Sequence, residues 1–375
     1  MSFGKTAVFI AKIIAAWALL CACQVCLRKG RHPVLRTAVF LIKLLLIPAA
    51  AIMFVAVTGA FSYRHGDILA AVYVALVGDT AASAAEYLIR RLKHIKDRTA
   101  GRLPCIKKLN CVLSLLFCVC FAVFGIVNAG RVVKRTHVWQ ADGLTREHTF
   151  VFMADIHAGN AQSLETLEKV CAQINDVSPE FVILGGDVTD EMTSREDMTA
   201  AYRILSGIEA PVYFVYGNHD RQPDADLLGG RTYSDSELEA ALRGAGIRVL
   251  SDEFVKVADD LVLLGREDVS MGGARKPWSQ LSDPYGGVGA LLVADHQPYD
   301  EEQLAEEVSA LQLSGHTLAG QLWPLRFVYL MLGLPAYGEF EEAGTRLYVT
   351  AGESGWMLPL RTQARCEWEL ITLRP

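Results

Sequence analysis

Residues 211–220 read PVYFVYGNHD, a short apolar run that ends in a cluster of polar side chains. An uninterrupted apolar run of this length, rich in valine, tyrosine and phenylalanine, is typical of a buried strand. Two earlier segments have the same form, TFVFMADIH at 149–157 and FVILGGDVTD at 181–190. Segments with helical periodicity separate the three runs. Alternating strands and helices predict an α/β architecture.

The remainder of the C-terminal half continues this pattern. Apolar residues recur at helical spacing after residue 163, and Ser194 and Ser234 each stand three residues before an acidic residue, as at a capped helix start. Further elements are expected as strands at about 247–257, 261–265, 290–296, 311–316, 345–352 and 366–373, and as a helix at about 300–311.

Polar side chains stand at or just past the ends of five of these expected strands. They are Asp155, His157, Asp187, Asn218, His219, His296 and His316. In open α/β sheets this edge is where ligands bind. Taken singly, each motif also fits a solvated loop or a structural histidine. Carboxylates, an amide and imidazoles that converge from five loops together predict a divalent-metal site.

The ordered motifs Asp-x-His, Gly-Asp-x-x-Asp, Gly-Asn-His-Asp, a histidine after a strand and Gly-His-Thr resemble those of the calcineurin-like metallophosphoesterases. The membrane-anchored bacterial branch is the most similar, and the resemblance covers about residues 148–374. It implies a four-layer α-β-β-α sandwich that holds two metal ions. The ions would be manganese, iron or zinc.

The resemblance also implies a role for each motif residue. The first metal would be bound by Asp155, His157 and the bridging Asp187. The second metal would be bound by Asp187, Asn218, His296 and His316. His219 would face the phosphate as a catalytic residue. Asp220 beside it would either raise the pKa of His219 or cap the turn.

The loop SGHTLAGQ at 314–321 departs from the family pattern. The family has a second histidine two residues after the position of His316, where this chain has Leu318, and Ala319 replaces a usual glycine. The first metal therefore loses one ligand, and its affinity is expected to fall by ~10–100-fold or more. Two metals bind if the first site is occupied despite Leu318, and otherwise one. Alternatively, the protein is inactive, or the motif is aligned in the wrong register.

We therefore expect a metal-dependent phosphoric ester hydrolase that cleaves a phosphomonoester or a phosphodiester by metal-activated hydroxide. The alternative is a metal-weakened pseudoenzyme that acts as a membrane sensor or scaffold. The apolar segment 326–338 is either a wall beside the phosphate site, which accepts a lipid chain or rests on the bilayer, or a buried element of the second sheet. Glu353 is either a substitute metal ligand or an ordinary loop residue.

The first 130 residues hold the excess of a composition that is 51% hydrophobic. Four apolar stretches, at about 6–27, 37–61, 68–89 and 109–130, reach the roughly 20 residues that a crossing needs. The third is the weakest because it contains Asp79. Lys43 and Asp79 are either functional or part of the packing of the helix bundle. The sequence thus predicts a region of four transmembrane helices over residues 1–135 and a phosphoesterase domain over 148–375.

The distribution of charge sets the expected membrane topology, and the net charge argues against nucleic acid as a partner. Basic residues gather between the first two stretches and between the last two, and basic loops stay cytoplasmic. The C-terminal domain is therefore expected outside the cytoplasm, although a cleaved signal peptide is a rival interpretation of the first stretch. The net charge of −6 gives no indication of nucleic-acid binding. Seven of the nine cysteines lie in or beside the apolar stretches, so they form no disulfide framework. No protein partner can be inferred.

Overall fold

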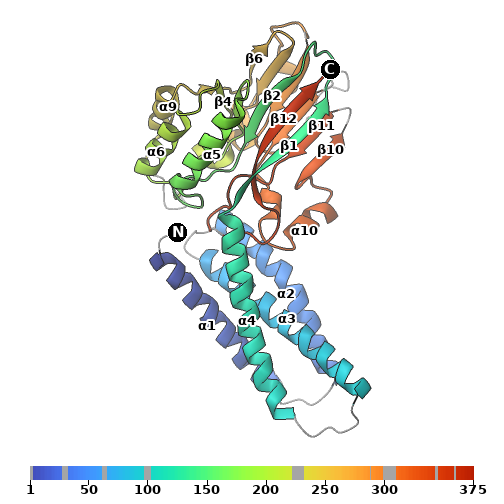
Figure 1. Ribbon diagram of the computed structural model, residues 1–375. Helices are drawn as coiled ribbons and strands as arrows, with labels where there is room; N and C mark the ends of the chain where they lie inside the picture. Colours follow the sequence, from blue (N-terminus) through green and yellow to red (C-terminus); the bar gives the residue numbers. More distant parts are fainter. Residues whose placement is uncertain are drawn as a thin grey trace. The chain divides into compact units, whose positions relative to one another are not determined.

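The computed structural model describes most of the chain, in two compact units. The described residues are 3–27, 33–60, 66–96, 103–221, 232–287, 289–298, 310–342, 345–358 and 360–375. One unit contains Met1–Val127 with Leu322–Leu325, and the other contains Asn128–Gln321 with Arg326–Pro375. Figure 1 shows the first unit as helices and the second as sheets with helices.

The N-terminal unit contains the four predicted helices. They are α1 (Phe3–Leu27), α2 (Pro33–Ala60), α3 (Gly66–Lys96) and α4 (Leu103–Ala129). Among the described residues, only Ile68–Leu88 and Val112–Ala129 are long and apolar enough to cross a membrane. The apolar parts of the other two helices, Val8–Leu20 and Thr37–Met53, are shorter than the roughly 20 residues that a bilayer requires. The predicted region of four transmembrane helices is therefore not supported. The basic segments 28–32 and 97–102, which set the predicted topology, lie outside the described residues.

A buried polar network connects the four helices of this unit. The ammonium of Lys43 on α2 forms an ion pair with Asp79 on α3. Ser114 Oγ on α4 donates to Asp79 Oδ1 at 3.3 Å, and Trp17 Nε1 on α1 donates to Ser114 Oγ at 3.0 Å. Buried charges need such partners because their desolvation is costly. Lys43 and Asp79 thus take part in the packing of the bundle.

The first sheet of the C-terminal unit confirms the α/β prediction. Its strand order is β1-β12-β2-β3-β4-β5, and β2 to β5 run parallel. The strands are β1 (Val132–Gln140), β12 (Cys366–Arg374), β2 (His148–Met153), β3 (Val182–Leu184), β4 (Val212–Phe214) and β5 (Arg248–Val249). Strand β1 pairs with β12 and was not predicted, because most of its residues are partly or fully exposed and it therefore lacks an apolar run.

The second sheet also has six strands, in the order β10-β11-β9-β8-β7-β6. They are β10 (Gly338–Glu342), β11 (Thr345–Val349), β9 (Ala310–Ser314), β8 (Ala290–Ala294), β7 (Leu261–Gly265) and β6 (Glu253–Ala258). The four central strands run parallel, and the two edge strands run antiparallel to their neighbours. Both sheets therefore present the carboxyl ends of several parallel strands.

Alternating side chains of β2 separate two cores. Val151 and Met153 pack with the helices on the outer face of the first sheet, whereas Phe150 and Phe152 pack between the two sheets. The outer helices are α5 (Leu164–Val177), α6 (Arg195–Leu205) and α9 (Asp235–Gly244). Their N-termini are capped by Ser163, Ser194 and Ser234. These elements form three layers of the predicted four-layer sandwich.

The fourth layer is only partly described. Trp278 and Leu281 pack on the outer face of the second sheet, beside the short turns η2 (Val269–Ala274) and η3 (Trp278–Gln280). Most of the helix expected at about 300–311 falls in 299–309, which lies outside the described residues, and β9 already begins at Ala310.

The apolar segment 326–338 forms a helix and a turn instead of a buried strand of the second sheet. Helix α10 spans Leu325–Met331, and β10 begins only at Gly338. Phe327 keeps 56% and Met331 78% of its surface exposed. The expectation of a buried element was therefore wrong, because an apolar run by itself does not distinguish a buried strand from an exposed helix.

Candidate metal centre

Five loops that follow parallel strands supply the predicted site residues. Asp155 and His157 follow β2, Asp187 follows β3, and Asn218 begins α7 (Asn218–Arg221) after β4. His296 and His316 follow β8 and β9 of the second sheet. Backbone hydrogen bonds join the loops: His157 N donates to Asp187 O at 3.0 Å, and Gly315 N donates to His296 O at 2.9 Å. The site thus lies where the carboxyl ends of both sheets meet.

Asp187 belongs to two groups of acidic and imidazole side chains. One group is Asp155, His157 and Asp187, and the other is Asp187, His296 and His316. In each group the ligand atoms lie within 4.8 Å of one another. Both carboxylates are buried, with at most 1% of their surface exposed. Buried acidic groups at this spacing need cationic partners, and a divalent ion in each group meets that need.

The contacts of His296 match those of a metal-binding imidazole. Its Nδ1 donates to the carbonyl of Gly185 at 2.8 Å, so that Nε2 faces the shared carboxylate. Burial lowers the pKa of His296, but the charge of Asp187 outweighs it and raises the pKa well above its usual range, so a bound ion would replace a proton on Nε2. Nε2 lies 3.0 Å from Asp187 Oδ2 and is buried without a hydrogen-bond partner. Two ligand atoms at this distance fit coordination to one shared ion. His296 is therefore oriented as a ligand by its own backbone contact.

His157 is oriented in a similar way by a second carboxylate. Its Nδ1 lies 3.3 Å from Asp190 Oδ2, and its Nε2 lies 3.9 Å from Asp187 Oδ2. Asn160 Nδ2 also donates to Asp190 Oδ2 at 3.1 Å. Asp190 is thus placed to direct the second nitrogen of His157 towards the shared carboxylate.

His316 and Asn218 place two further donor atoms beside the shared carboxylate. His316 Nδ1 lies 2.8 Å from Asn218 Oδ1. Burial, followed by the charge of the neighbouring His296, lowers the pKa of His316 to about 3. A neutral imidazole at physiological pH has a lone pair for a metal ion. The backbone N–H of His316 donates to both oxygens of Asp155, at 3.0 and 3.1 Å, and so joins the two groups.

The two carboxylates of the site differ in their electrostatics. Burial raises the pKa of Asp187, but the charges of His296, His219 and His157 outweigh it, so that the pKa falls well below its usual range. Burial also raises the pKa of Asp155, and there the nearby imidazoles do not compensate. Asp187 is therefore the carboxylate that stays charged between the two groups.

His219 is held by a residue that the sequence analysis missed. Its Nδ1 lies 2.6 Å from Glu191 Oε1, and its backbone N–H donates to Asp187 Oδ1 at 2.8 Å. Burial lowers the pKa of His219, but the charges of Asp187 and Glu191 outweigh it and raise the pKa to about 9. Glu191 follows Asp190 directly in the second motif, yet no periodicity marked it. A protonated imidazole at this position can bind phosphate or protonate a leaving oxygen.

Asp220 connects loops, as the capping alternative expected. Its carboxylate accepts backbone hydrogen bonds from Asp187 at 2.8 Å, Gly217 at 2.9 Å and Thr189 at 3.1 Å. Burial, followed by the charge of Asp187, raises its pKa to about 6. Asp220 therefore fixes the backbone on which the bridging carboxylate stands.

Leu318 occupies a strained position in the loop after β9. It begins η4 (Leu318–Gly320), and its φ is +52°, next to Ala319 at +50°. Its carbonyl accepts a hydrogen bond of 2.7 Å from Arg361, a buried side chain that also donates to the carbonyls of Ser354 and Ala351. The loop is thus firmly held, but a leucine side chain has no ligand atom to offer the first group.

Glu353 does not join either group in the described part of the chain. Its Oε1 accepts a hydrogen bond of 3.0 Å from Gln162, and its backbone N–H donates to Ala154 O at 2.9 Å. Burial raises the pKa of Glu353 to about 8, so the carboxyl is protonated at neutral pH. The hypothesis that Glu353 substitutes for the missing histidine is not supported by these contacts.

The backbone at the site is strained where the ligands stand. Asp155, His157, Asp187 and His316 all have φ between +46° and +67°, in the left-handed region that favours glycine. Each such residue costs roughly 1–3 kcal/mol, and such strain concentrates at functional sites. Gly217 shows how tightly the loops pack, because a Cβ there would lie 2.1 Å from Asp187 Oδ1.

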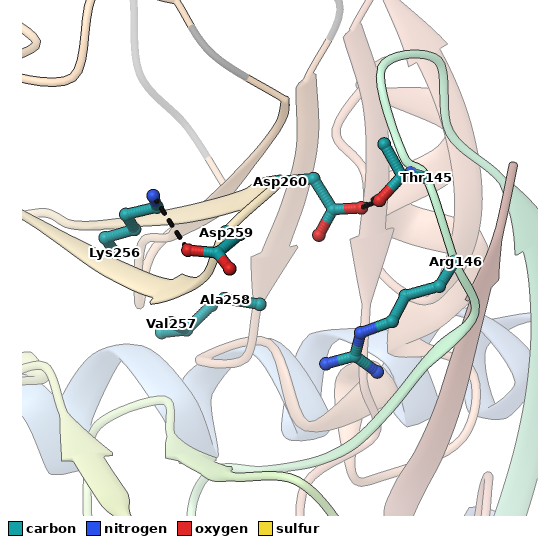
Figure 2. A pocket seen from close by; sticks show the side chains of 7 residues that line it. All are labelled: Thr145, Arg146, Lys256, Val257, Ala258, Asp259 and Asp260. Carbon is teal, nitrogen blue, oxygen red and sulfur yellow. Dashed lines mark hydrogen bonds and ion pairs between the residues drawn. The ribbon is translucent and has the colours of Figure 1, made fainter.

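Figure 2 shows a cavity elsewhere in this unit, at the ends of the strands opposite to the metal loops. Its volume is about 470 Å³, and its lining includes Thr145, which precedes β2, and Asp260, which precedes β7. Lys256 forms an ion pair of 3.1 Å with Asp259, and Asp260 accepts a hydrogen bond from Thr145. The cavity is therefore separate from the metal loops, which follow the other ends of the strands.

Residues 148–319 match the family model of calcineurin-like phosphoesterases. The chain is also similar to a "Transmembrane protein with metallophosphoesterase domain" of Danio rerio, 28% identical over 281 residues, which are 70% of this chain. The match spans only 62% of that relative's length.

Two bacterial proteins show comparable similarity. The chain is 28% identical to the uncharacterized metallophosphoesterase YkuE of Bacillus subtilis and 29% identical to the phosphodiesterase YaeI of Escherichia coli. Each match covers 60% of this chain. The matches cover 78% and 81% of those proteins.

Proposed function

Because the chain carries a calcineurin-like metallophosphoesterase domain, we propose that it hydrolyses a phosphate ester with the help of divalent metal ions. One observation carries the proposal: two acidic and imidazole groups share the carboxylate of Asp187. When bound, the ions would supply an activated water and neutralise charge that develops at phosphorus. The residues proposed to hold them are Asp155, His157, Asp187, Asn218, His296 and His316.

The chain's own residues have separable roles in this reaction. Asp187 is shared because its Oδ2 lies 3.0 Å from His296 Nε2 and 3.9 Å from His157 Nε2. Asn218 adds a neutral oxygen that does not increase the negative charge of the site. His219, whose pKa is about 9, carries a proton at neutral pH and can donate it to the leaving oxygen. Glu191 holds the imidazole through Nδ1 at 2.6 Å. Asp220 acts on the reaction indirectly, through the backbone of Asp187.

The proposal also specifies how many ions bind and how strongly. We propose one strongly bound ion at Asp187, Asn218, His296 and His316. A second ion would bind more weakly at Asp155, His157 and Asp187, where Leu318 replaces the fourth ligand. Three protein ligands still hold catalytic ions in other proteins, where water completes the coordination. Imidazole and carboxylate ligands suit manganese, iron or zinc.

The first test is hydrolysis of small chromogenic esters by the purified full chain. We expect manganese-dependent cleavage of an aryl phosphodiester, because one relative is named a phosphodiesterase, and slower cleavage of the corresponding monoester. Asp187→Asn removes the shared charge and should abolish the activity. Asp259→Asn, a fully exposed aspartate on the β6–β7 turn, is the matched control and should not change it.

A binding protein without activity is the second candidate, and the replacement at Leu318 favours it. In that case the chain would bind at most one ion and would cleave neither ester at any manganese concentration. Metal binding without turnover, retained in wild type and lost in His296→Ala, would establish this alternative. The two candidates therefore differ in turnover and not in fold.

We further propose that the helices α1–α4 anchor the domain in a membrane and that the domain lies outside the cytoplasm. Two candidate spans and the network around Asp79 that connects all four helices support the anchor. The positive charge between α1 and α2 and between α3 and α4 supports the orientation. On this basis the chain divides into a membrane region at 1–135 and a phosphoesterase domain at 148–375.

The packing of the proposed anchor helices is tested by variants of the buried ion pair between Lys43 and Asp79. Asp79→Leu leaves the ammonium of Lys43 without its partner and should destabilise the helical unit by about 3–5 kcal/mol. The double variant Lys43→Met with Asp79→Leu should recover most of that loss in a thermal unfolding measurement. Digestion of a C-terminal tag by protease added to intact cells tests the orientation, and a tag that resists digestion would contradict it.

A further inference from the structure

Helix α10 and the turn after it expose a cluster of large apolar side chains. The exposed fractions are 56% for Phe327, 49% for Leu330, 78% for Met331 and 66% for Leu332. A single exposed leucine is ordinary, but four such residues within six positions form a patch that indicates a partner surface. We call residues 327–332 the α10 patch.

Elsewhere in the described part of this unit, exposed large apolar side chains stand singly along the sequence. They are Val138, Met192 and Val269, on three separate segments. The α10 patch thus differs from the scattered apolar exposure that every soluble surface has.

The patch has little charge around it. Between Thr317 and Gly338 the sequence has no acidic residue, and its one charged side chain is that of Arg326. The guanidinium of Arg326 lies 4.8 Å from the centre of the Tyr337 ring. A surface without carboxylates, with a cation and a tyrosine beside it, suits the headgroup layer of a bilayer, where anionic lipids repel acidic groups.

The end of a candidate membrane span is hydrogen-bonded to residues 361–364, which in turn contact Gln321 before the patch. The amide of Asn128, at the end of α4, donates to the carbonyls of Arg361, Gln363 and Ala364 at 3.0–3.1 Å. The backbone N–H groups of Thr362 and Gln363 in turn donate to Gln321 O.

Gln321 stands four residues before the start of α10. Short hydrogen-bonded steps therefore join Asn128 to Gln321, in the loop that contains His316, and the α10 patch belongs to the same unit as both. A span ends at the membrane surface, so Asn128 is the point of this unit that the proposed anchor brings to that surface.

We propose that the α10 patch inserts into the interfacial layer of the same bilayer that α4 enters. The inference rests on the proposed membrane anchor and goes beyond it, because a span fixes the chain to the membrane without requiring α10 to touch lipid. Insertion holds the loop with His316 at the level of the lipid headgroups. A short amphipathic segment that buries several apolar side chains in this layer is a known mode of interfacial binding.

The test measures contact between the patch and lipid tails in the full chain. Leu330→Trp and Met331→Trp are reconstituted into phosphatidylcholine vesicles whose acyl chains are brominated. We expect the emission of each added tryptophan to shift to the blue in vesicles and to be largely lost with brominated lipid, relative to wild type. Val138→Trp, on β1, is the matched control at an exposed apolar position and should show neither change.

The outcomes separate the two proposals. A chain that stays in the vesicles during an alkaline wash, but whose added tryptophans are quenched by iodide in the water and not by brominated lipid, overturns the insertion and leaves the anchor standing. Equal quenching by lipid at positions 138, 330 and 331 also overturns it, because contact would then not be specific to α10. A chain that the wash removes overturns the anchor and the insertion together.

Discussion

The two groups that share Asp187 differ by one side chain. The group with His296 and His316 also has the oxygen of Asn218, 2.8 Å from His316 Nδ1. The group with Asp155 and His157 has three members, and the loop that would supply a fourth has Leu318. Both groups nevertheless keep oriented imidazoles and a strained backbone. The difference is the basis of our proposal that the site retains a framework for two ions while its chemistry favours one.

The largest effect is expected where the groups meet. Asp187→Ala removes the shared carboxylate and should reduce hydrolysis to background, by more than the ~10²–10³-fold lost with one electrostatic donor in other enzymes. Metal content should fall to zero in the same preparation. Steady-state rates and elemental analysis check both results. A variant that keeps one ion would show that the groups are independent of each other.

A smaller but more selective effect separates the groups. His296→Ala should release the strongly bound ion and cost at least ten times more activity than His157→Ala, which disturbs only the weaker group. The measurement is turnover at increasing manganese concentrations. We expect high manganese to restore His157→Ala towards wild type and to leave His296→Ala inactive. Equal losses in both variants would contradict the asymmetry.

The next effect concerns His219, which stands beside both groups. Glu191→Gln keeps the size of the side chain and removes the charge that pairs with the imidazole at 2.6 Å. Turnover should fall by about 10–100-fold, the range for lost supporting contacts, while KM and metal content stay unchanged. Glu191→Asp should recover part of the turnover. A change in metal content would show instead that Glu191 holds the metal loops.

The smallest effect is on stability, in the loop that distinguishes the groups. Ala319 has a φ of +50°, so Ala319→Gly relieves strain and should stabilise the chain by up to about 1 kcal/mol, less the entropy that glycine adds to the unfolded state. Ala245→Gly, at an ordinary φ of −81° after α9, is the control and should destabilise slightly. Thermal unfolding of both variants checks the sign.

The sequence predicted the strands and the site loops because both depend on local patterns. Buried parallel strands such as β3 read as continuous apolar runs, and the residues after them must meet at one edge of the sheet. The serine caps at Ser194 and Ser234 were equally local signals. Positions that follow from strand order and helix capping were therefore within reach of sequence reasoning.

Contacts between segments that are distant in the sequence could not be predicted from local patterns. Glu191 and Arg361 act through partners that the fold brings together, and no periodicity marks them. The exposure of α10 could not be decided from the sequence, because an apolar run fits a buried strand and a lipid-facing segment equally well. The left-handed backbone at Asp155 and Asp187 is a property of the folded loops. It could not be predicted because a positive φ is expected at glycine and not at aspartate.

The most direct test of the central claim is metal stoichiometry of the full chain, measured by elemental analysis after gel filtration, for wild type and Leu318→His. The account predicts one retained ion per wild-type chain and two in Leu318→His. Leu332→His, at an exposed leucine of the α10 patch, is the matched control and should remain at one. No retained ion in either wild type or Leu318→His would contradict the assignment of these residues as metal ligands.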